Sequence, residues 1–161
     1  MINKSYLYVF FAIGALTCLG GCFSSNDSKE ITSSLKVVNV LDKEFFDDCH
    51  IPGSIHIPMM DVIKVAKKEK WLQDTKIVVY CSNYSCTAST TVCRQLMKEG
   101  FNHVWDYEAG TAGWYQDKLP VEGPAKAGYL TQENKPLDGF SSEGVQVIST
   151  EELRKMMEEE K

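Results

Sequence analysis

Three short apolar segments in the middle of the chain predict buried β-strands. Residues 36–40 (KVVNV) and 76–80 (KIVVY) are rich in β-branched side chains and apolar at consecutive positions, and residues 103–107 (HVWDY) are a third candidate. Consecutive apolar positions are typical of strands that are covered on both faces, as in a parallel sheet. The pattern therefore predicts a central sheet that is mainly parallel.

Two helical patterns lie between these strands. Residues 61–71 begin with an aspartate suited to capping and continue with four apolar residues among the next five. Residues 87–99 end before Gly100, a residue type that commonly follows a helix. The side of this second helix expected to face the sheet carries Ala88, Val92, Leu96 and Met97. Strands that alternate with helices predict an α/β sandwich.

A further strand and helix are predicted near the C-terminus. Residues 120–142 combine Pro, Gly, Ser and charge without periodicity, which predicts an exposed connection. Residues 145–148 then predict a strand, and residues 150–160 predict a helix that begins with a capping box of Ser149 and Glu152. A narrow apolar stripe indicates that this helix packs on a core, and it consists of Leu153, Met156 and Met157.

The N-terminal residues have the pattern of an export signal. Lys4 is the only charge before Cys22, and the apolar stretch 6–19 is short for a membrane span. The stretch ends in Leu-Gly-Gly-Cys, which resembles the lipobox of bacterial lipoproteins and implies lipidation of Cys22. An uncleaved anchor helix and an ordinary cleaved signal are the alternatives. We expect a signal peptide over residues 1–21, a polar tether over 22–34, and an extracytoplasmic, membrane-anchored location in the cell envelope.

Composition is that of a globular protein, with 43% hydrophobic and 24% charged residues. The net charge is −5 and no cluster of Lys or Arg is present, so nothing predicts a nucleic-acid partner. Four cysteines follow Cys22, and outside the cytoplasm their thiols tend towards disulfides. They are Cys49, Cys81, Cys86 and Cys93.

The strongest candidate for chemistry is Cys81, which directly follows the predicted strand 76–80. Backbone amides in a loop that leads into a helix favour negative charge, so a cysteine there is expected to have a lowered pKa and more thiolate. Thiolate is the form that attacks sulfur or carbon. The alternative is a small buried apolar residue at the end of a strand. The candidate loop comprises Ser82, Asn83, Tyr84, Ser85, Cys86 and Thr87.

Several motifs occur in an order that resembles one family. They are residues 50–55 (HIPGSI) with Ile57-Pro58, residues 77–81 (IVVYC), Gly100-Phe101, Val104, Gly110, Trp114 and residues 119–123 (LPVEG). Together they resemble a rhodanese domain over residues 36–123. The resemblance implies an α/β fold with a central parallel sheet. It also implies a Cys81 persulfide that takes sulfur from a small donor and passes it to an acceptor thiol or cyanide, without an organic cofactor.

The chain departs from this family at the loop position where many members have an arginine that holds anionic donors. Cys86 occupies that position, which argues against thiosulfate as the donor. The first arginine after Cys81 is Arg94, within the following helix, so the arginine clamp of a phosphatase or arsenate reductase is missing from the loop. No CxxC or HxxxH spacing is present, and no metal site is predicted.

Cys86 has three interpretations. It is a resolving thiol that forms a disulfide with Cys81 after the persulfide leaves, an oxidised structural partner, or a small residue that faces the helix core. Cys49 is expected to be buried and unpaired, with a disulfide to either loop cysteine as the alternative. Cys93 is expected in the core of the helix 87–99.

The order of the predicted elements is unusual for the family. Rhodanese domains commonly open with a strand and a helix of the type Ser-x-Glu-Glu-Leu, and here that pattern follows at residues 147–153. We therefore divide the chain into a domain at 35–123, a connection at 124–144, and a strand and helix at 145–161 that complete the same domain by circular permutation. A truncated second domain and an element swapped into a neighbouring molecule are the alternatives.

These observations lead to three functional hypotheses. The first is a membrane-anchored sulfurtransferase or sulfur carrier that forms a Cys81 persulfide, with a small sulfur donor and a thiol acceptor as partners. The second is a thiol–disulfide redox protein that uses Cys81 and Cys86. The third is a non-catalytic rhodanese-like binding module. The sequence makes no prediction of the oligomeric state.

Overall fold

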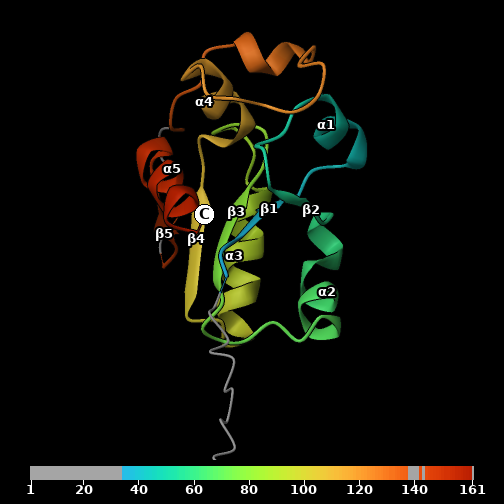
Figure 1. Cartoon of the computed structure of the whole chain (residues 1–161), viewed down its shortest axis with the longest axis vertical. Helices are drawn as coiled ribbons and strands as arrows, with labels where there is room; N and C mark the ends of the chain where they lie inside the picture. The colour runs from blue at the N-terminus through green and yellow to red at the C-terminus, as the bar shows by residue number, and fades with distance from the viewer. Residues whose placement is uncertain (1–33, 138–141, 143, 161) are drawn as a thin grey trace, which may run out of the picture. The chain divides into compact units, whose positions relative to one another are not determined.

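The computed structural model describes residues 34–137, 142 and 144–160; the expected signal peptide and residues 22–33 of the expected tether lie outside this range. In the described part, five strands form one sheet in the order β2-β1-β3-β4-β5, and every neighbouring pair is parallel (Figure 1). The strands are β1 (Lys36–Asn39), β2 (Ile55–His56), β3 (Lys76–Tyr80), β4 (His103–Tyr107) and β5 (Gln146–Val147). The predicted parallel sheet is confirmed.

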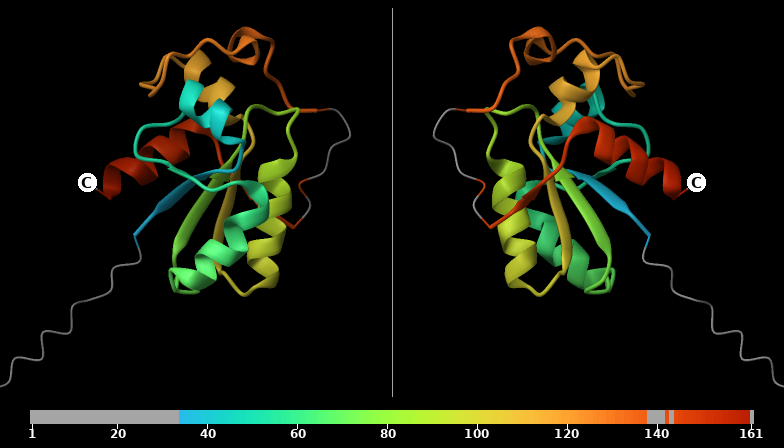
Figure 2. Two further views of the ribbon diagram at one scale, coloured as in Figure 1. Left: turned by 90° about the vertical axis from the view of Figure 1, so that its right-hand side faces the viewer. Right: turned by 90° about the vertical axis from the view of Figure 1, so that its left-hand side faces the viewer.

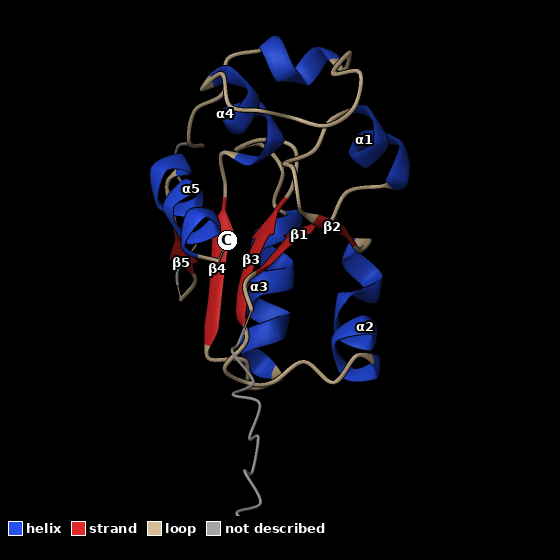
Figure 3. Cartoon of the chain, in the orientation of Figure 1, coloured by secondary structure: helices blue, strands red, loops and turns tan. Residues whose placement is uncertain are grey.

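Helices cover both faces of the sheet. Two of them, α2 (Val62–Lys68) and α3 (Ala88–Lys98), lie on one face, and α5 (Thr150–Glu159) lies on the other (Figure 2). The short helices α1 (Lys43–Asp48) and α4 (Gly110–Gln116) lie beyond the carboxyl ends of the strands (Figure 3). Two 3₁₀ turns complete the list, η1 (Met59–Asp61) and η2 (Gly128–Thr131). None of the helices in the described residues combines the length and apolar character needed to cross a bilayer.

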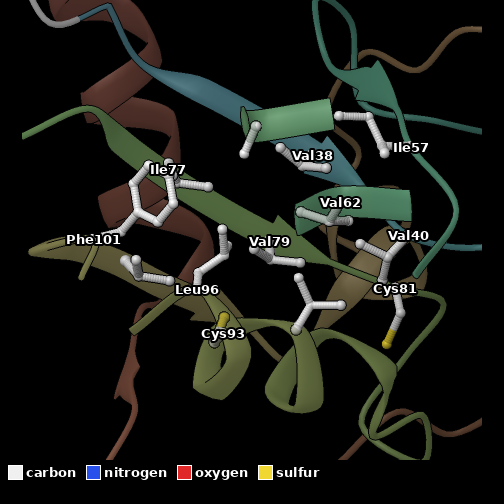
Figure 4. Packing of buried hydrophobic residues seen from close by; sticks show 13 residues of the cluster. Val38, Val40, Ile57, Val62, Ile77, Val79, Cys81, Cys93, Leu96 and Phe101 are labelled. Atoms are coloured by element: carbon white, nitrogen blue, oxygen red, sulfur yellow. The ribbon is translucent and has the colours of Figure 1, made fainter. Parts of the chain in front are cut away.

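The sheet is buried on both faces, which explains the consecutive apolar positions in its strands. Along β3, Ile77 and Val79 point towards the core under α2 and α3, and Cys81 continues this row at the end of the strand (Figure 4). Val78 and Tyr80 point to the opposite core, beneath α5. Because β3 pairs with β1 on one side and β4 on the other, Cys81 lies at the carboxyl edge in the middle of the sheet. Ligand sites of parallel α/β sheets are usually at this edge.

The C-terminal strand and helix complete this sheet. Trp105 of β4 pairs with Gln146 of β5, and the Ile148 amide donates to the Asp106 carbonyl at 3.0 Å. Leu153 of α5 is fully buried in the core on that face, and the predicted capping box of Ser149 and Glu152 is present. This pairing within one chain is what the circular-permutation hypothesis requires.

The helix pattern was assigned incorrectly in two respects. Met97 was expected on the packed side of α3 but is 42% exposed, and Ser89 and Cys93 are fully buried there instead. The side chains of Asp61 and Thr87 precede α2 and α3 but make no capping hydrogen bond. The helices α1 and α4 were not predicted, because each is too short to show a helical period.

The expected connection over residues 120–142 is exposed or half-exposed at most of its described residues, with one buried side chain. Leu130 is only 1% exposed. The Asp48 carboxylate accepts hydrogen bonds from the amides of Lys126 and Ala127, and the Gln116 side chain donates to the Leu130 carbonyl. Polar side chains of α1 and α4 thus hold residues 125–134, hereafter the 125–134 segment, against the carboxyl edge of the sheet.

Candidate functional site

Cys81 directly follows β3, and its side chain is fully buried. Its sulfur lies 3.0 Å from the Cys86 carbonyl oxygen and 3.4 Å from the Ser89 hydroxyl. The Cys81 sulfur therefore lies between a backbone carbonyl oxygen and the hydroxyl of a residue in the first turn of α3.

Cys86 lies in a different environment five residues further on. Its side chain is partly exposed, and the backbone amides of Ala88 and Ser82 are near enough to favour its thiolate. The contact that joins the two residues runs from the Cys81 sulfur to the Cys86 carbonyl oxygen. Both cysteines are free thiols in the structure.

The surroundings affect the two thiols in opposite directions. The neighbouring Cys81 side chain and the amides of Ala88 and Ser82 lower the pKa of Cys86. The neighbouring Cys86 side chain and burial raise the pKa of Cys81. In this structure, burial thus acts against the lowered Cys81 pKa that the sequence predicts.

The loop amides that were expected to surround Cys81 have other acceptors. The Tyr84 amide donates to Asn134 Oδ1 at 3.1 Å, and the Ser85 amide donates to Asn83 Oδ1 at 3.2 Å. The Cys86 amide donates to the Asn83 carbonyl at 3.0 Å. Three of the loop amides are thus used to shape the loop and do not point at the Cys81 sulfur.

The start of α4 holds the first residues of the loop. The Thr111 amide donates to the Cys81 carbonyl at 3.0 Å, and the Ala112 amide donates to the Ser82 carbonyl at 2.9 Å. Gly110 has a φ of +61°, and a Cβ at this position would lie 2.7 Å from the Cys81 carbonyl oxygen. Only glycine permits this approach. The Gly110 of the family motif therefore sets the position of the loop backbone.

A buried polar pair lies behind the site. Asp106 of β4 has no exposed surface, and its Oδ2 accepts a hydrogen bond from the Thr90 hydroxyl at 2.6 Å. Burial raises the pKa of Asp106 to about 6. Thr90 neighbours Ser89 in α3, so this carboxyl group helps to orient the helix turn that contacts Cys81.

Sequence analysis missed two residues of the site, Ser89 and Asn134. Ser89 lies on the same face of α3 as the buried Cys93 and Leu96, and a small polar residue on an apolar face was the signal for it. Asn134 gave no signal, because it lies in the aperiodic 125–134 segment.

The other candidate cysteines lie apart from the loop pair. Cys49 is free and fully buried, and burial raises its pKa to about 11. Cys93 is also free and donates to the Trp105 carbonyl at 3.5 Å. Within the described ranges, no three His, Cys, Asp or Glu side chains gather in a way that would hold a metal ion.

The chain belongs to the rhodanese-like domain family, whose sequence profile matches residues 25–117. One relative is YrkF of Bacillus subtilis, provisionally named a sulfur carrier protein, with 31% identity over 81 residues. This match covers 50% of the chain but only 42% of YrkF, so the chain spans less than half of that relative.

Solved structures agree with this assignment. BH2092 from Bacillus halodurans superimposes with a TM-score of 0.54 at 28% identity, covering 65% of this chain and 76% of that protein. A thiosulfate sulfurtransferase from Pseudomonas aeruginosa gives a TM-score of 0.51 at 18% identity, covering 56% of this chain and 17% of its own. The second likeness concerns the fold alone.

Proposed function

We propose that this chain is a sulfurtransferase or sulfur carrier that holds sulfane sulfur as a persulfide on Cys81. One observation carries the proposal: Cys81 directly follows the carboxyl end of β3, at the start of the loop that leads into α3 of a rhodanese-like domain. The similarity to YrkF, which is provisionally named a sulfur carrier, supports it.

The transfer needs no external oxidant. A Cys81 thiolate attacks the outer sulfur of a donor persulfide R–S–SH, the donor sulfur–sulfur bond breaks, and RS⁻ leaves with the electron pair. An acceptor thiolate then attacks the outer sulfur of the Cys81 persulfide, and Cys81 leaves as the thiolate. The thiol and persulfide forms of the site are regenerated in turn.

The loop lacks a basic side chain that would hold thiosulfate, so we expect this donor to react weakly. Residues 82–87 contain no basic side chain. Ala88, next to the loop, contributes to a hollow of about 270 Å³ in which Asp42 is the only charged lining residue. The hollow is lined by Val40, Leu41, Asp42, Phe45, Pro58, Met59, Met60 and Ala88. The hollow thus offers no positive charge to a dianionic donor.

A thiol–disulfide function is the second candidate, because Cys81 and Cys86 are free thiols and the Cys81 sulfur lies 3.0 Å from the Cys86 carbonyl oxygen. In that reaction the Cys86 thiolate and the Cys81 thiol lose two electrons and one proton to an oxidised dithiol substrate, and a Cys81–Cys86 disulfide results. The same disulfide forms when Cys86 acts as the resolving thiol: its thiolate displaces hydrosulfide from the Cys81 persulfide.

Intact-mass measurement distinguishes these functions. The reduced full-length chain and its Cys81→Ser variant are incubated separately with thiosulfate, polysulfide and glutathione persulfide. We expect the wild type to gain one sulfur from polysulfide and glutathione persulfide, and a weaker gain from thiosulfate. A wild type that gains no sulfur but loses two hydrogens supports the redox function instead. No mass change with any donor contradicts both and leaves the binding module.

We further propose that the chain is held at a membrane by lipid on Cys22, with the folded domain outside the cytoplasm. The lipobox-like Leu-Gly-Gly-Cys and the single charge before Cys22 support this location. Cys22→Ser is expected to move the chain from the membrane fraction to the soluble fraction and to abolish incorporation of labelled palmitate. Cys18→Ser is the matched control, and an unlabelled wild type would contradict the proposal.

A further inference from the structure

The Cys81 sulfur needs a hydrogen-bond donor when it carries negative charge, and three of the loop amides are directed elsewhere. In the proposed transfer this sulfur is charged twice, first as the attacking thiolate and then as the leaving group. The amides of Tyr84, Ser85 and Cys86 donate to other acceptors. Two backbone carbonyl oxygens lie close to the sulfur, that of Cys86 at 3.0 Å and that of Asn83 at 4.0 Å. A carbonyl oxygen accepts a hydrogen bond from a thiol but repels a thiolate.

The Ser89 hydroxyl is placed to be that donor. Ser89 is fully buried in the first turn of α3, and its Oγ lies 3.4 Å from the Cys81 sulfur. The single proton of the Cys81 thiol is directed at the Cys86 carbonyl oxygen, so the hydroxyl is the donor of this pair. When the thiol ionises, the hydroxyl keeps its acceptor and the hydrogen bond becomes charge-assisted. The Cys86 side chain and burial raise the pKa of Cys81, and the Ser89 hydroxyl opposes them.

A buried hydrogen bond fixes the helix turn that carries Ser89. Asp106 Oδ2 accepts this bond from the Thr90 hydroxyl at 2.6 Å, and neither residue is more than 1% exposed. Thr90 directly follows Ser89, so the contact ties the first turn of α3 to β4 of the central sheet. A donor that is held in place before the reaction stabilises charge without the cost of reorganisation.

We infer that Ser89 is a catalytic residue of this domain: its hydroxyl stabilises the Cys81 thiolate when Cys81 attacks the donor and again when Cys81 leaves. The inference rests on the proposed function and adds a second side chain that contacts the reacting sulfur. The hydroxyl keeps its proton in both steps, so the bonds that form and break in the transfer are unchanged.

The pH dependence of sulfur loading tests this role. The reduced full-length wild type, Ser89→Ala and Thr91→Ala are mixed with glutathione persulfide between about pH 6 and 10, and the rate of sulfur gain at Cys81 is followed by mass spectrometry. We expect Ser89→Ala to load about tenfold more slowly at pH 7, with its profile displaced by about one pH unit to higher pH and its plateau unchanged. Thr91→Ala removes an exposed hydroxyl of the same helix, which donates to the Thr87 carbonyl, and should keep the wild-type profile.

The competing outcomes separate the inference from the proposed function. The donor and the titratable neighbours Cys86 and Asp106 are the same in all three chains, so the difference between profiles reports on the hydroxyl. An unchanged profile, or a lower plateau at an unchanged pH midpoint, overturns the role of Ser89 and leaves transfer through Cys81 intact. Failure of the wild type to load overturns both. Iodoacetamide gives a readout without a sulfur donor: alkylation of Cys81 should reach its half-maximal rate at higher pH in Ser89→Ala, and equal midpoints overturn the inference.

Discussion

Asn134 Oδ1 accepts a hydrogen bond from the Tyr84 amide at 3.1 Å, although the two residues are 50 positions apart. The same side chain donates from Nδ2 to the Ala109 carbonyl at 2.9 Å. One carboxamide thus joins the cysteine loop to the residue before α4. The 125–134 segment is therefore part of the site.

Replacing Asn134 by Ala should loosen the loop. The Tyr84 amide and the Ala109 carbonyl would lose their partners, which is expected to cost about 1–3 kcal/mol of unfolding free energy. Sulfur loading should slow as well, because the loop shape depends on the Tyr84 amide. Denaturant unfolding and loading kinetics measure the two effects. The control is Asn102→Ala, because the Asn102 side chain donates to Asp74 in an exposed pair. If both variants lose the same unfolding free energy and both load sulfur normally, Asn134 does not hold the loop.

Gly110→Ala should displace the loop backbone. The added Cβ would lie 2.7 Å from the Cys81 carbonyl oxygen, and the alanine would have to adopt a positive φ. We therefore expect the free energy of unfolding to fall by about 2 kcal/mol or more. Gly128→Ala is the matched control, because its Cβ would have no neighbour within 4 Å. The difference in denaturation midpoint between the two variants measures the effect. Equal stability would show that α4 does not set the loop position.

Asp106 should make stability depend on pH. Its folded pKa, about 6, lies above the ordinary value of 3.8 because burial penalises the carboxylate. The folded chain therefore binds this proton more tightly than the unfolded chain. The resulting contribution to the free energy of unfolding is about 3 kcal/mol. It is fully present below pH 4 and is lost as the pH rises through 6.

Asp106→Asn removes this titration. The stability difference between wild type and variant should therefore shift towards the wild type as the pH falls from 7 to 4.5, measured by urea unfolding at several pH values. Asp61→Asn, at an exposed aspartate, should keep the wild-type pH dependence. A difference between wild type and Asp106→Asn that stays constant with pH would exclude Asp106 as the titrating group.

Leu153→Ala tests whether α5 belongs to the same cooperative unit. The side chain is fully buried against the sheet, so truncation is expected to cost about 2–5 kcal/mol and to lower a single unfolding transition. Lys155→Ala, on the exposed side of α5, should change stability by less than about 0.5 kcal/mol. Two separate transitions, with only one of them shifted, would argue for an independent element.

The parallel sheet was predictable because a strand that is buried on both faces has apolar residues at consecutive positions. Val37 and Val38 are consecutive and face opposite cores, and the same holds for Val78 and Val79. The position of Cys81 at the end of β3 followed from the same pattern. The C-terminal strand and helix were predictable from the capping box and the Leu153 stripe.

The charge of the site was not predictable, because it depends on where a few backbone atoms point. A loop of this sequence can direct its amides at either sulfur. Asn83 and Asn134 accept hydrogen bonds from the amides of the next loop residues, Tyr84, Ser85 and Cys86. The loop shape that results directs the Cys86 carbonyl towards the Cys81 sulfur. Neither asparagine has a periodic or spacing signal that would reveal this role.

The pairing of β5 with β4 has a consequence for the edge of the sheet. Residues 108–145 separate the two strands, so their contact closes a long loop. Without β5, the outer edge of β4 would present unpaired amides and carbonyls to other chains. The last strand of the chain therefore shields an edge that could otherwise pair with a neighbouring molecule.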